Sequence, residues 1–421
     1  MNEQRWKVGA ANPKVVYARQ PFPDTVTKTI FLAGPTPRGD AESWRPKAVD
    51  ILAELGFDGH VFVPEPEDGQ WAEDYLDQVD WEDEGLHRAD CIVFWVPRDK
   101  TGEHYGGQML GLTTNDEWGF WKDSGKVVWG APGWAEHVRY QTHYAKKFGA
   151  PNSTTLKATL QSAVSQVGEG AQRSGGRAQV PLHIWNKPEF QGWLEAQEET
   201  GNRLDGCRVD WSFRVPPPNF SDGGPPPSRL FLYALHVDMH IGSEKRQKKN
   251  EVVILRPDIS SVVLYRPRFS MNEFAEVEVV LVREYRSPAR NEDGFVYELP
   301  GGSGEGDPLI NAKKEVHEET GLKIASGQPF SLRVAGLTVA ATRFTGHGPR
   351  QVAATLSGHV CHLYSVELTE SEMDKLKADK SVHGENDEEK TYIEVMTVGD
   401  ILRRPIVDWS MMGMISKALA G

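Results

Sequence analysis

Short apolar runs alternate with amphipathic stretches over the first third of the chain. Thr29–Ala33 is an apolar strand that leads into a Gly-Pro loop, and apolar residues then recur at helical spacing from Ala48 to Leu55. Two further strand–helix pairs follow, with a fourth strand at "KVVWGAP". Continuously apolar strands that alternate with helices predict a parallel α/β sheet, with ligands at the carboxyl ends of its strands.

The pattern changes twice further along. Residues 135–205 are mostly helical in pattern, and the segment Arg214–Arg229 holds six prolines, which predict a linker or a long surface loop. Runs of β-forming residues then dominate, with one acidic helix at about 308–320 and a last helix at "DWSMMGMISKALA". The second half is therefore expected to be a mixed α+β domain.

Four segments follow from these changes. Each is defined by its own composition, and their limits are 1–28 for an irregular arm, 29–150 for the α/β domain, 151–228 for a helical connector with the Pro/Gly-rich linker, and 229–421 for the α+β domain.

Composition limits the class of protein and its partners. Hydrophobic residues make up 39% of the 421 residues and the 13 tryptophans argue against a disordered chain. A net charge of −13 argues against a nucleic-acid surface, and no apolar run is long enough for a membrane span. The three separated cysteines fit a reducing compartment. We expect a soluble, cytoplasmic protein that acts on small molecules.

The stretch "KEVHEETGL" carries the first candidate chemistry. Glu315, Glu318 and Glu319 lie at i, i+3 and i+4, so one face of a helix presents three carboxylates that repel one another. One interpretation is a solvated acidic face. The other is a site for Mg²⁺ or Mn²⁺, because hard oxygen ligands suit these cations and "PGG" at 300–302 lets the backbone approach.

The residues around this helix favour the metal site. "ELPGG" followed by "KKEVHEETGL" resembles the Nudix hydrolase signature, with Lys314 where the family has arginine and a loop one or two residues shorter than the family pattern. The resemblance implies a Nudix fold, an α/β/α sandwich. It also implies that the carbonyl of Gly301, with Glu315 and Glu319, holds the metal, and that Glu318 supports the site.

The strand before the signature narrows this resemblance. "VVLVREYRSP" is similar to the ADP-ribose pyrophosphatase branch, which implies hydrolysis of a nucleoside diphosphate derivative such as ADP-ribose. The β-rich segment at 229–265 resembles the one that pairs across a dimer in that branch, which implies a homodimer. Arg283 and Arg286 are then candidates to clamp phosphates, the alternative being surface arginines. A late acidic loop supplies a catalytic base or a further ligand in that branch, and Glu385 or Glu388 is the candidate here.

The first domain holds a second candidate site. The loop after the first strand contains Gly34 and Pro35, Asp90 precedes the strand "CIVFWVP", and Glu117 follows a Thr-Thr-Asn-Asp lead-in. We expect Glu117 in the first turn of a helix, where the helix N-terminus would keep its carboxylate ionised as a nucleophile requires. The alternative is an ordinary N-terminal acid of a helix.

These three pieces, in this order, resemble the nucleoside 2-deoxyribosyltransferase family over about residues 28–135. The resemblance implies that Glu117 attacks C1′ of a nucleoside and displaces the base, with Thr114 beside it, and that Asp90 orients or protonates the base. Gly34, Pro35 and Arg38 fit the sugar loop of the family. Trp44, Trp81, Trp95 and Trp118 are candidates to stack on the base, with core packing as the alternative.

One position departs from that family pattern. The enzymes carry a second acid six residues before the nucleophile, and this chain has Gly111 there. Protonation of the base then requires another acid, for which Asp99, Glu103 and Asp116 are the nearby candidates. Cleavage of the N-glycosidic bond with water as the acceptor stays open.

Two hypotheses for the whole chain result. The first is an enzyme with two sites, one cleaving or exchanging an N-glycosidic bond and the other hydrolysing a diphosphate, acting in turn on an NAD-like molecule. The second is a first domain that senses a nucleotide without chemistry and regulates the hydrolase. The sequence predicts no nucleic-acid or membrane partner for either hypothesis.

Overall fold

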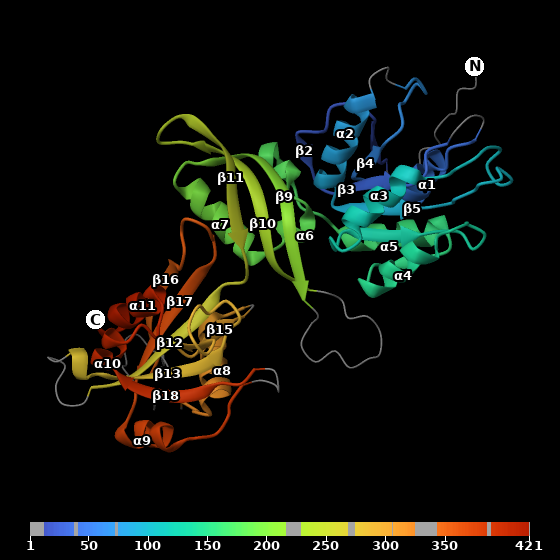
Figure 1. The fold of residues 1–421 in the computed structure, drawn as a ribbon. Helices are drawn as coiled ribbons and strands as arrows, with labels where there is room; N and C mark the ends of the chain where they lie inside the picture. Colours follow the sequence, from blue (N-terminus) through green and yellow to red (C-terminus); the bar gives the residue numbers. More distant parts are fainter. Residues whose placement is uncertain are drawn as a thin grey trace, which may run out of the picture. The chain divides into compact units, whose positions relative to one another are not determined.

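The computed structural model describes residues 12–37, 41–71, 75–215, 229–267, 274–304, 306–324, 343–384 and 389–420. The chain forms two compact units, Met1–Leu255 and Arg256–Gly421 (Figure 1). The sequence prediction began the second domain at residue 229. The boundary falls later because the first strand after residue 228 pairs with the strand Arg203–Val215 of the first unit, and the second strand pairs with the first.

A six-stranded sheet forms the centre of the first unit, and all of its strand pairs are parallel, as predicted. In sheet order these strands are β1 (Lys14–Tyr17), β4 (His60–Val63), β3 (Thr29–Ala33), β5 (Cys91–Trp95), β6 (Val127–Gly130) and β7 (Asn152–Ser153). Both faces of the central strands are buried, which explains why they read as continuous apolar runs.

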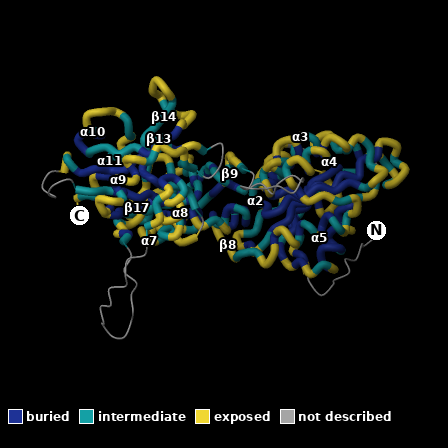
Figure 2. The backbone as a smooth tube through the Cα atoms, turned by 90° about the horizontal axis from the view of Figure 1, so that it is seen from below, coloured by how far each residue is buried: buried dark blue, intermediate teal, exposed yellow. Residues whose placement is uncertain are grey.

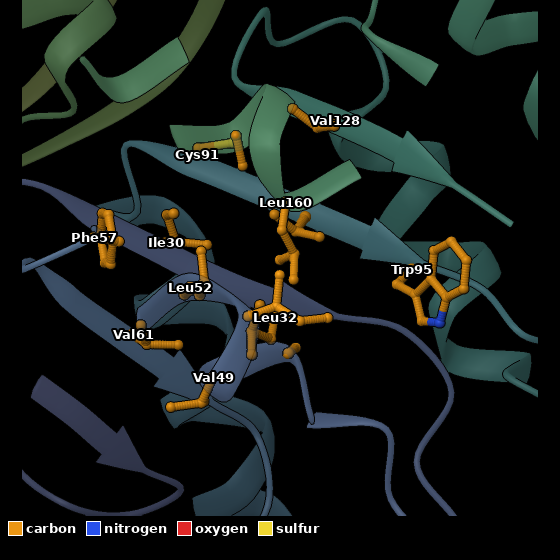
Figure 3. Packing of buried hydrophobic residues seen from close by; sticks show 14 of the residues in the cluster. Ile30, Leu32, Val49, Leu52, Phe57, Val61, Cys91, Trp95, Val128 and Leu160 are labelled. Atoms are coloured by element: carbon orange, nitrogen blue, oxygen red, sulfur yellow. The ribbon is translucent and has the colours of Figure 1, made fainter. Parts of the chain in front are cut away.

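Helices cover the two faces of this sheet, because successive strand residues point to opposite sides. On one face Ile30, Leu32 and Val93 pack with residues of α1 and α5 (Figure 3). On the other face Phe31 and Phe94 pack with residues of α2, α3 and α4. The helices are α1 (Arg45–Glu54), α2 (Tyr75–Arg88), α3 (Leu112–Trp121), α4 (Arg139–Lys147) and α5 (Leu156–Val167).

The rest of the first unit is a small α/β layer with its own core. Its three-stranded antiparallel sheet has the order β11-β10-β9, and Tyr233, Leu235 and Val237 of the central strand pack with Phe190 and Leu194 of α7. The strands and helices of this layer are α6 (Leu182–Trp185), α7 (Pro188–Glu199), β9 (Arg203–Val215), β10 (Arg229–Ile241) and β11 (Arg246–Leu255).

Short elements join this layer to the parallel sheet. They are the two-stranded sheet of β2 (Thr25–Val26) and β8 (Arg173–Ser174) and the 3₁₀ turn η1 (Gly175–Gln179). The predicted connector over 151–228 is thus helical only in part, because β9 is a long strand within it.

The second unit contains a mixed seven-stranded sheet, as expected for an α+β domain. The pair β12–β17 is parallel, and the other pairs are antiparallel. Its strands are β12 (Ile259–Arg266), β13 (Glu278–Tyr285), β14 (Phe295–Glu298), β15 (Gly301–Ser303), β16 (Thr345–Gln351), β17 (Val360–Glu367) and β18 (Tyr392–Thr397).

Helices lie on both faces of this sheet too. Val280 of β13 packs with Ala312 and Val316 of α8 on one face, and Leu281 packs with Ile415 of α11 in the core of the other. The helical elements are η2 (Phe274–Glu276), α8 (Pro308–Thr320), α9 (Glu370–Ala378), α10 (Val398–Arg403) and α11 (Trp409–Leu419). The predictions of an acidic helix at about 308–320 and of a last helix are confirmed.

Burial follows the same plan in both units. The central strands form the buried interior, drawn in dark blue in Figure 2. Within the part of the chain that the structure describes, every helix is too short or too polar to cross a lipid bilayer.

Candidate functional site

A pocket of about 350 Å³ lies at the carboxyl ends of β3 and β4 in the first unit. It lies at the edge where parallel α/β sheets bind ligands. Gly34, a residue of the predicted sugar loop, forms one wall. This glycine has φ +146°, and a Cβ there would lie 2.1 Å from the carbonyl oxygen of Trp95, so a side chain is excluded. Pro35 follows, and its carbonyl accepts a hydrogen bond from the indole of Trp44 at 3.1 Å.

Glu117 and Glu82 both line this pocket, from α3 and α2 respectively. Burial raises the pKa of Glu117 to about 7, the negative charge of Glu82 adds to the rise, and Arg45 opposes it. Burial also raises the pKa of Glu82, which a hydrogen bond from Gln78 at 2.6 Å and the charge of Arg45 counteract. Two carboxyl groups in one pocket are thus available for acid–base and nucleophilic chemistry.

The helix that carries Glu117 begins earlier than the sequence suggested. α3 starts at Leu112, so Glu117 lies in the second turn and not in the first. The helix N-terminus therefore does not stabilise its carboxylate, since that effect fades within the first turn. This correction agrees with a raised pKa. Thr114, which the resemblance placed beside Glu117, is buried within the first turn of α3.

Gly111, where the resembling enzymes have an acid, is constrained by its surroundings. It has φ +61°, and a Cβ there would lie 2.7 Å from Cγ of Pro35. A side chain at this position would displace the loop of Gly34 and Pro35. Glu82, which the sequence analysis missed, provides the second carboxyl group from a different helix. Its only sequence signal is its place on the polar face of α2, which many solvated glutamates share.

Arg45 links the segments that form the floor of the pocket through hydrogen bonds and an ion pair. Its side chain is buried, pairs with Glu65, and donates hydrogen bonds to the carbonyls of Leu32 at 3.0 Å and Gly34 at 2.8 Å. These bonds fix the end of β3 below the two glutamates. The positive charge of Arg45 also lowers the pKa of both acids, so this residue tunes the site.

Asp90 is not part of this pocket. It precedes β5, at the amino end of the parallel strands, and its carboxylate accepts hydrogen bonds from Arg173 at 2.8 and 2.7 Å and from the backbone N–H groups of Thr29 and Leu182. All of its partners are structural, so the expectation that Asp90 orients or protonates a base is wrong.

Asp99, one of the alternative acids, also has a structural role. It stabilises its own loop, because its carboxylate accepts hydrogen bonds from the backbone N–H groups of Gly102 and His104, both at 2.8 Å. Burial acts to raise the pKa of Asp99. The hydrogen bonds from Gly102, His104 and Thr101 outweigh it, so the pKa of Asp99 is lowered.

The candidate tryptophans belong to the core of the first unit, and a different tryptophan lines the pocket. The four named from the sequence are all buried: Trp44, Trp81, Trp95 and Trp118. Trp71, which the sequence analysis did not single out, lines the pocket and is 50% exposed. Arg38, the third residue of the predicted sugar loop, lies outside the described residues.

A second acidic site lies in the second unit. Carboxylate oxygens of Glu284, Glu319 and Glu389 all lie within 4.8 Å of one another, which suits one metal ion. Glu319 is buried on α8 and accepts a hydrogen bond from the backbone N–H of Gly301 at 2.9 Å. Burial raises the pKa of Glu319 to about 9 despite that bond, and the charges of Glu315, Glu389 and Glu284 add to the rise.

The residues that the resemblance names in this unit differ in their contacts with the cluster. Glu315 lies beside Gly302, where an added Cβ would be 2.6 Å from its carboxyl group. Glu318 forms an ion pair with Lys314 at 2.8 Å and is not in the three-carboxylate cluster. At Gly301 the backbone N–H donates to the carboxylate of Glu319, so this residue adjoins the cluster, and the role of its carbonyl as a metal ligand stays a prediction.

The two arginines of β13 lie apart. Arg286 contacts Glu284 at 3.0 Å and Glu298 at 2.9 Å, at the edge of the acidic cluster. Arg283 directly precedes Glu284, so the two side chains point to opposite faces of β13. Its guanidinium lies 4.3 Å from the ring centre of Phe295, and it is therefore not placed with Arg286 as a second clamp at the cluster.

The late acidic segment supplies one carboxylate of the cluster, from a residue next to the predicted ones. Glu385 and Glu388 lie outside the described residues. Glu389, which follows them directly, is the member of the cluster that this segment provides. Glu284 was missed because it stands in a β-strand pattern, where a single acid reads as a solvent-facing residue.

Comparison with known proteins supports the first of the two sites. Residues 27–133 match the family model described as nucleoside 2-deoxyribosyltransferase like. The matched segment contains β3, the loop of Gly34 and Pro35, and both Glu82 and Glu117. No curated protein matches the chain. The match ends well before the acidic cluster of the second unit, so the Nudix resemblance stays an expectation.

Proposed function

We propose that the first unit cleaves or exchanges the N-glycosidic bond of a nucleoside or nucleotide, with Glu117 as the nucleophile and Glu82 as the acid. The observation that carries this proposal is the presence of both glutamates in one pocket at the carboxyl edge of the sheet. The match of residues 27–133 to nucleoside 2-deoxyribosyltransferase-like proteins supports the same chemistry.

The proposed reaction has two steps. The ionised carboxylate of Glu117 attacks C1′, the C1′–N bond breaks, and the base leaves with the proton delivered by Glu82. The resulting glycosyl ester is then attacked at C1′ by a second base or by water. The ester bond breaks, the carboxylate of Glu117 is restored, and Glu82 takes up the proton of the incoming group.

Other residues of the pocket fit supporting roles. Gln78 is buried and donates to Glu82 at 2.6 Å, which fixes the direction of that carboxyl group. Trp71 offers an aromatic face at the pocket wall, and an aromatic face suits a nucleobase, whose ring stacks on it. The pocket therefore combines a planar contact for the base with two carboxyl groups for the bond that joins base and sugar.

We further propose that the second unit hydrolyses a nucleoside diphosphate derivative such as ADP-ribose with Mg²⁺ or Mn²⁺. Glu284, Glu319 and Glu389 would hold the ion, with Glu315 close to Glu319, because converging carboxylate oxygens suit a hard cation. Burial raises the pKa of both Glu284 and Glu319, which is consistent with a site that is completed by a positive charge. The bound ion supplies neutralisation of diphosphate charge and activation of water. Arg286, next to Glu284, is placed to contact a phosphate.

One set of incubations tests both proposals. The purified chain is mixed with NAD, with ADP-ribose and with a panel of nucleosides, each with Mg²⁺ or with EDTA, and base release and AMP are measured separately. We expect base release that is insensitive to EDTA and AMP formation that EDTA abolishes. AMP from ADP-ribose without base release from any compound would leave only the hydrolase.

A variant of the chain and a binding measurement, added to these incubations, address the sensor hypothesis. A sensor would bind a nucleoside or nucleotide saturably in the first unit, and Glu117→Gln would retain this binding, with no base released by either form. A glycosidase or transferase loses turnover in Glu117→Gln while the binding of substrate persists.

A further inference from the structure

A cavity of about 280 Å³ lies in the second unit, away from the acidic cluster. It is enclosed by β16, β17 and α11, which lie side by side in Figure 1. Leu363 of β17 belongs to the core on the α11 face of the sheet, whereas Glu319 belongs to α8 on the opposite face. The cavity is thus separate from both sites discussed above.

The floor of the cavity is apolar and contains polarizable sulfur atoms. It is made by Leu363, the thiol of Cys361 and the thioether of Met414, whose sulfur lies 3.5 Å from that of Cys361. Sulfur-containing side chains are polarizable and pack well against flat aromatic groups. The floor therefore suits the apolar body of a small molecule.

The rim of the cavity is basic. Arg350 of β16 and Lys417 of α11 line it together with His347, and no aspartate or glutamate is among its described lining residues. Neither the guanidinium of Arg350 nor the ammonium of Lys417 forms a side-chain hydrogen bond or an ion pair with another residue in the described ranges. The chain as a whole carries a net charge of −13, so this local excess of positive charge favours an anion.

Two features of the backbone keep the cavity open. The register between β16 and β17 shifts between Gly346 and Pro349, which is a bulge in the edge strand at His347 and Gly348. Gly413 lies within α11, where glycine is unfavourable relative to alanine, and a Cβ there would contact no atom within 4 Å. Packing against the protein therefore does not explain this glycine, whereas space for a ligand does.

We propose that this cavity binds a small organic anion, with an aromatic or branched apolar body on Leu363, Cys361 and Met414 and a carboxylate or phosphate between Arg350 and Lys417. Its volume is close to the lower limit for ligand pockets, which limits the ligand to a small molecule. The site is independent of both reactions proposed above.

Phenyl phosphate and benzyl alcohol are the probes that test this proposal. They share an aromatic body, and only the first carries a charge. Binding to the full chain is measured by isothermal titration with EDTA present, which keeps divalent ions out of the acidic cluster. We expect saturable binding of phenyl phosphate in the low-millimolar range or tighter, and much weaker binding of benzyl alcohol.

Three variants locate the binding. Gly413→Leu fills the cavity and improves helix propensity, so it is expected to abolish binding while the melting temperature is kept or raised. Lys417→Gln is expected to weaken the binding of phenyl phosphate at least fivefold without changing the affinity for benzyl alcohol. Lys375→Gln, which removes an exposed cation of α9, is the matched control and is expected to leave both affinities unchanged.

Any of three results would overturn the proposal. These are equal affinity for the charged and the neutral probe, unchanged binding in both Gly413→Leu and Lys417→Gln, and no saturable binding of phenyl phosphate at millimolar concentration.

Discussion

Two carboxyl groups lie at opposite edges of the same parallel sheet, the buried one of Asp90 and the half-buried one of Glu117, and their surroundings differ in one respect. Asp90, at the amino edge, has two hydrogen bonds from Arg173 and two from backbone N–H groups. Glu117, at the carboxyl edge, faces a pocket and a second carboxyl group, and its pKa is raised to about 7. A buried carboxylate with a full set of donors stabilises a fold, whereas one without them is available for chemistry.

The difference comes from which segments close each edge. Residues 173–182 fold back over the amino edge and bring both Arg173 and the backbone of Leu182 to Asp90. The carboxyl edge ends in the loop of Gly34 and Pro35 and the start of α3, which leave a cavity above Arg45. Four changes test this comparison and its extension to the acidic cluster of the second unit.

Glu117→Gln is expected to have the largest effect. Removing the nucleophile should lower kcat for base release by about 10⁴-fold, which corresponds to ~5.5 kcal/mol of transition-state stabilisation. The melting temperature should not fall, because the carboxylate is destabilised by burial in the native state. Initial rates and thermal unfolding measure the two effects. A variant with wild-type turnover would remove Glu117 from the mechanism.

Asp90→Ala is expected to affect folding and not chemistry. It leaves the buried guanidinium of Arg173 without its partner, which should lower the free energy of unfolding by about 3–5 kcal/mol. Twelve of the 13 tryptophans precede residue 256, so tryptophan fluorescence in urea reports mainly on the first unit.

Asp58→Ala is the matched control for that prediction. It removes an exposed ion pair with Lys28 and should change stability far less. If Asp90→Ala keeps its stability but loses turnover, the structural role assigned to Asp90 is wrong.

Glu82→Gln is expected to change both rate and pH dependence. Loss of a general acid should slow release of bases that need protonation by about 10²–10³-fold, and should matter less for a 4-nitrophenyl glycoside, whose leaving group needs no proton. Removing the negative charge of Glu82 also lowers the pKa of Glu117.

The acidic limb of the pH profile provides the check on this prediction. Since Glu117 must be ionised to attack, kcat/KM should rise with pH through about 7 in the wild type. In Glu82→Gln this limb should move to lower pH. An unmoved limb would show that the two glutamates do not interact.

Glu319→Gln is expected to have the smallest measured effect, at least a tenfold loss of Mn²⁺ affinity. Glu318→Gln is the matched control on the same helix, since Glu318 pairs with Lys314 outside the cluster. Metal binding must displace the proton that Glu319 holds with a pKa of about 9, so affinity should increase with pH up to that value. Titration calorimetry at several pH values measures this. Equal losses in both variants would contradict the cluster as described.

Much of the fold was predictable because local patterns decide it. The apolar run Thr29–Ala33 and the continuous run of β5 could be buried only as central strands of a parallel sheet. The acidic helix α8 has a side-chain cap at Asp307 and a C-terminal Gly321, so its limits were readable as well. The domain boundary was not, because the pairing of β10 with β9 is a contact across the proline-rich linker.

The sequence by itself determined the residue types of the two candidate sites, namely Glu117 in its Thr-x-x-Glu-x-Gly setting and the glutamates of α8. Only the tertiary structure decided their partners. It placed Glu82 in the same pocket as Glu117. It also brought Glu284 and Glu389 close to Glu319, and it paired Asp90 with Arg173. The physical reason is that the pKa and reactivity of a carboxyl group depend on charges and donors within a few ångströms, which come from distant segments of the chain.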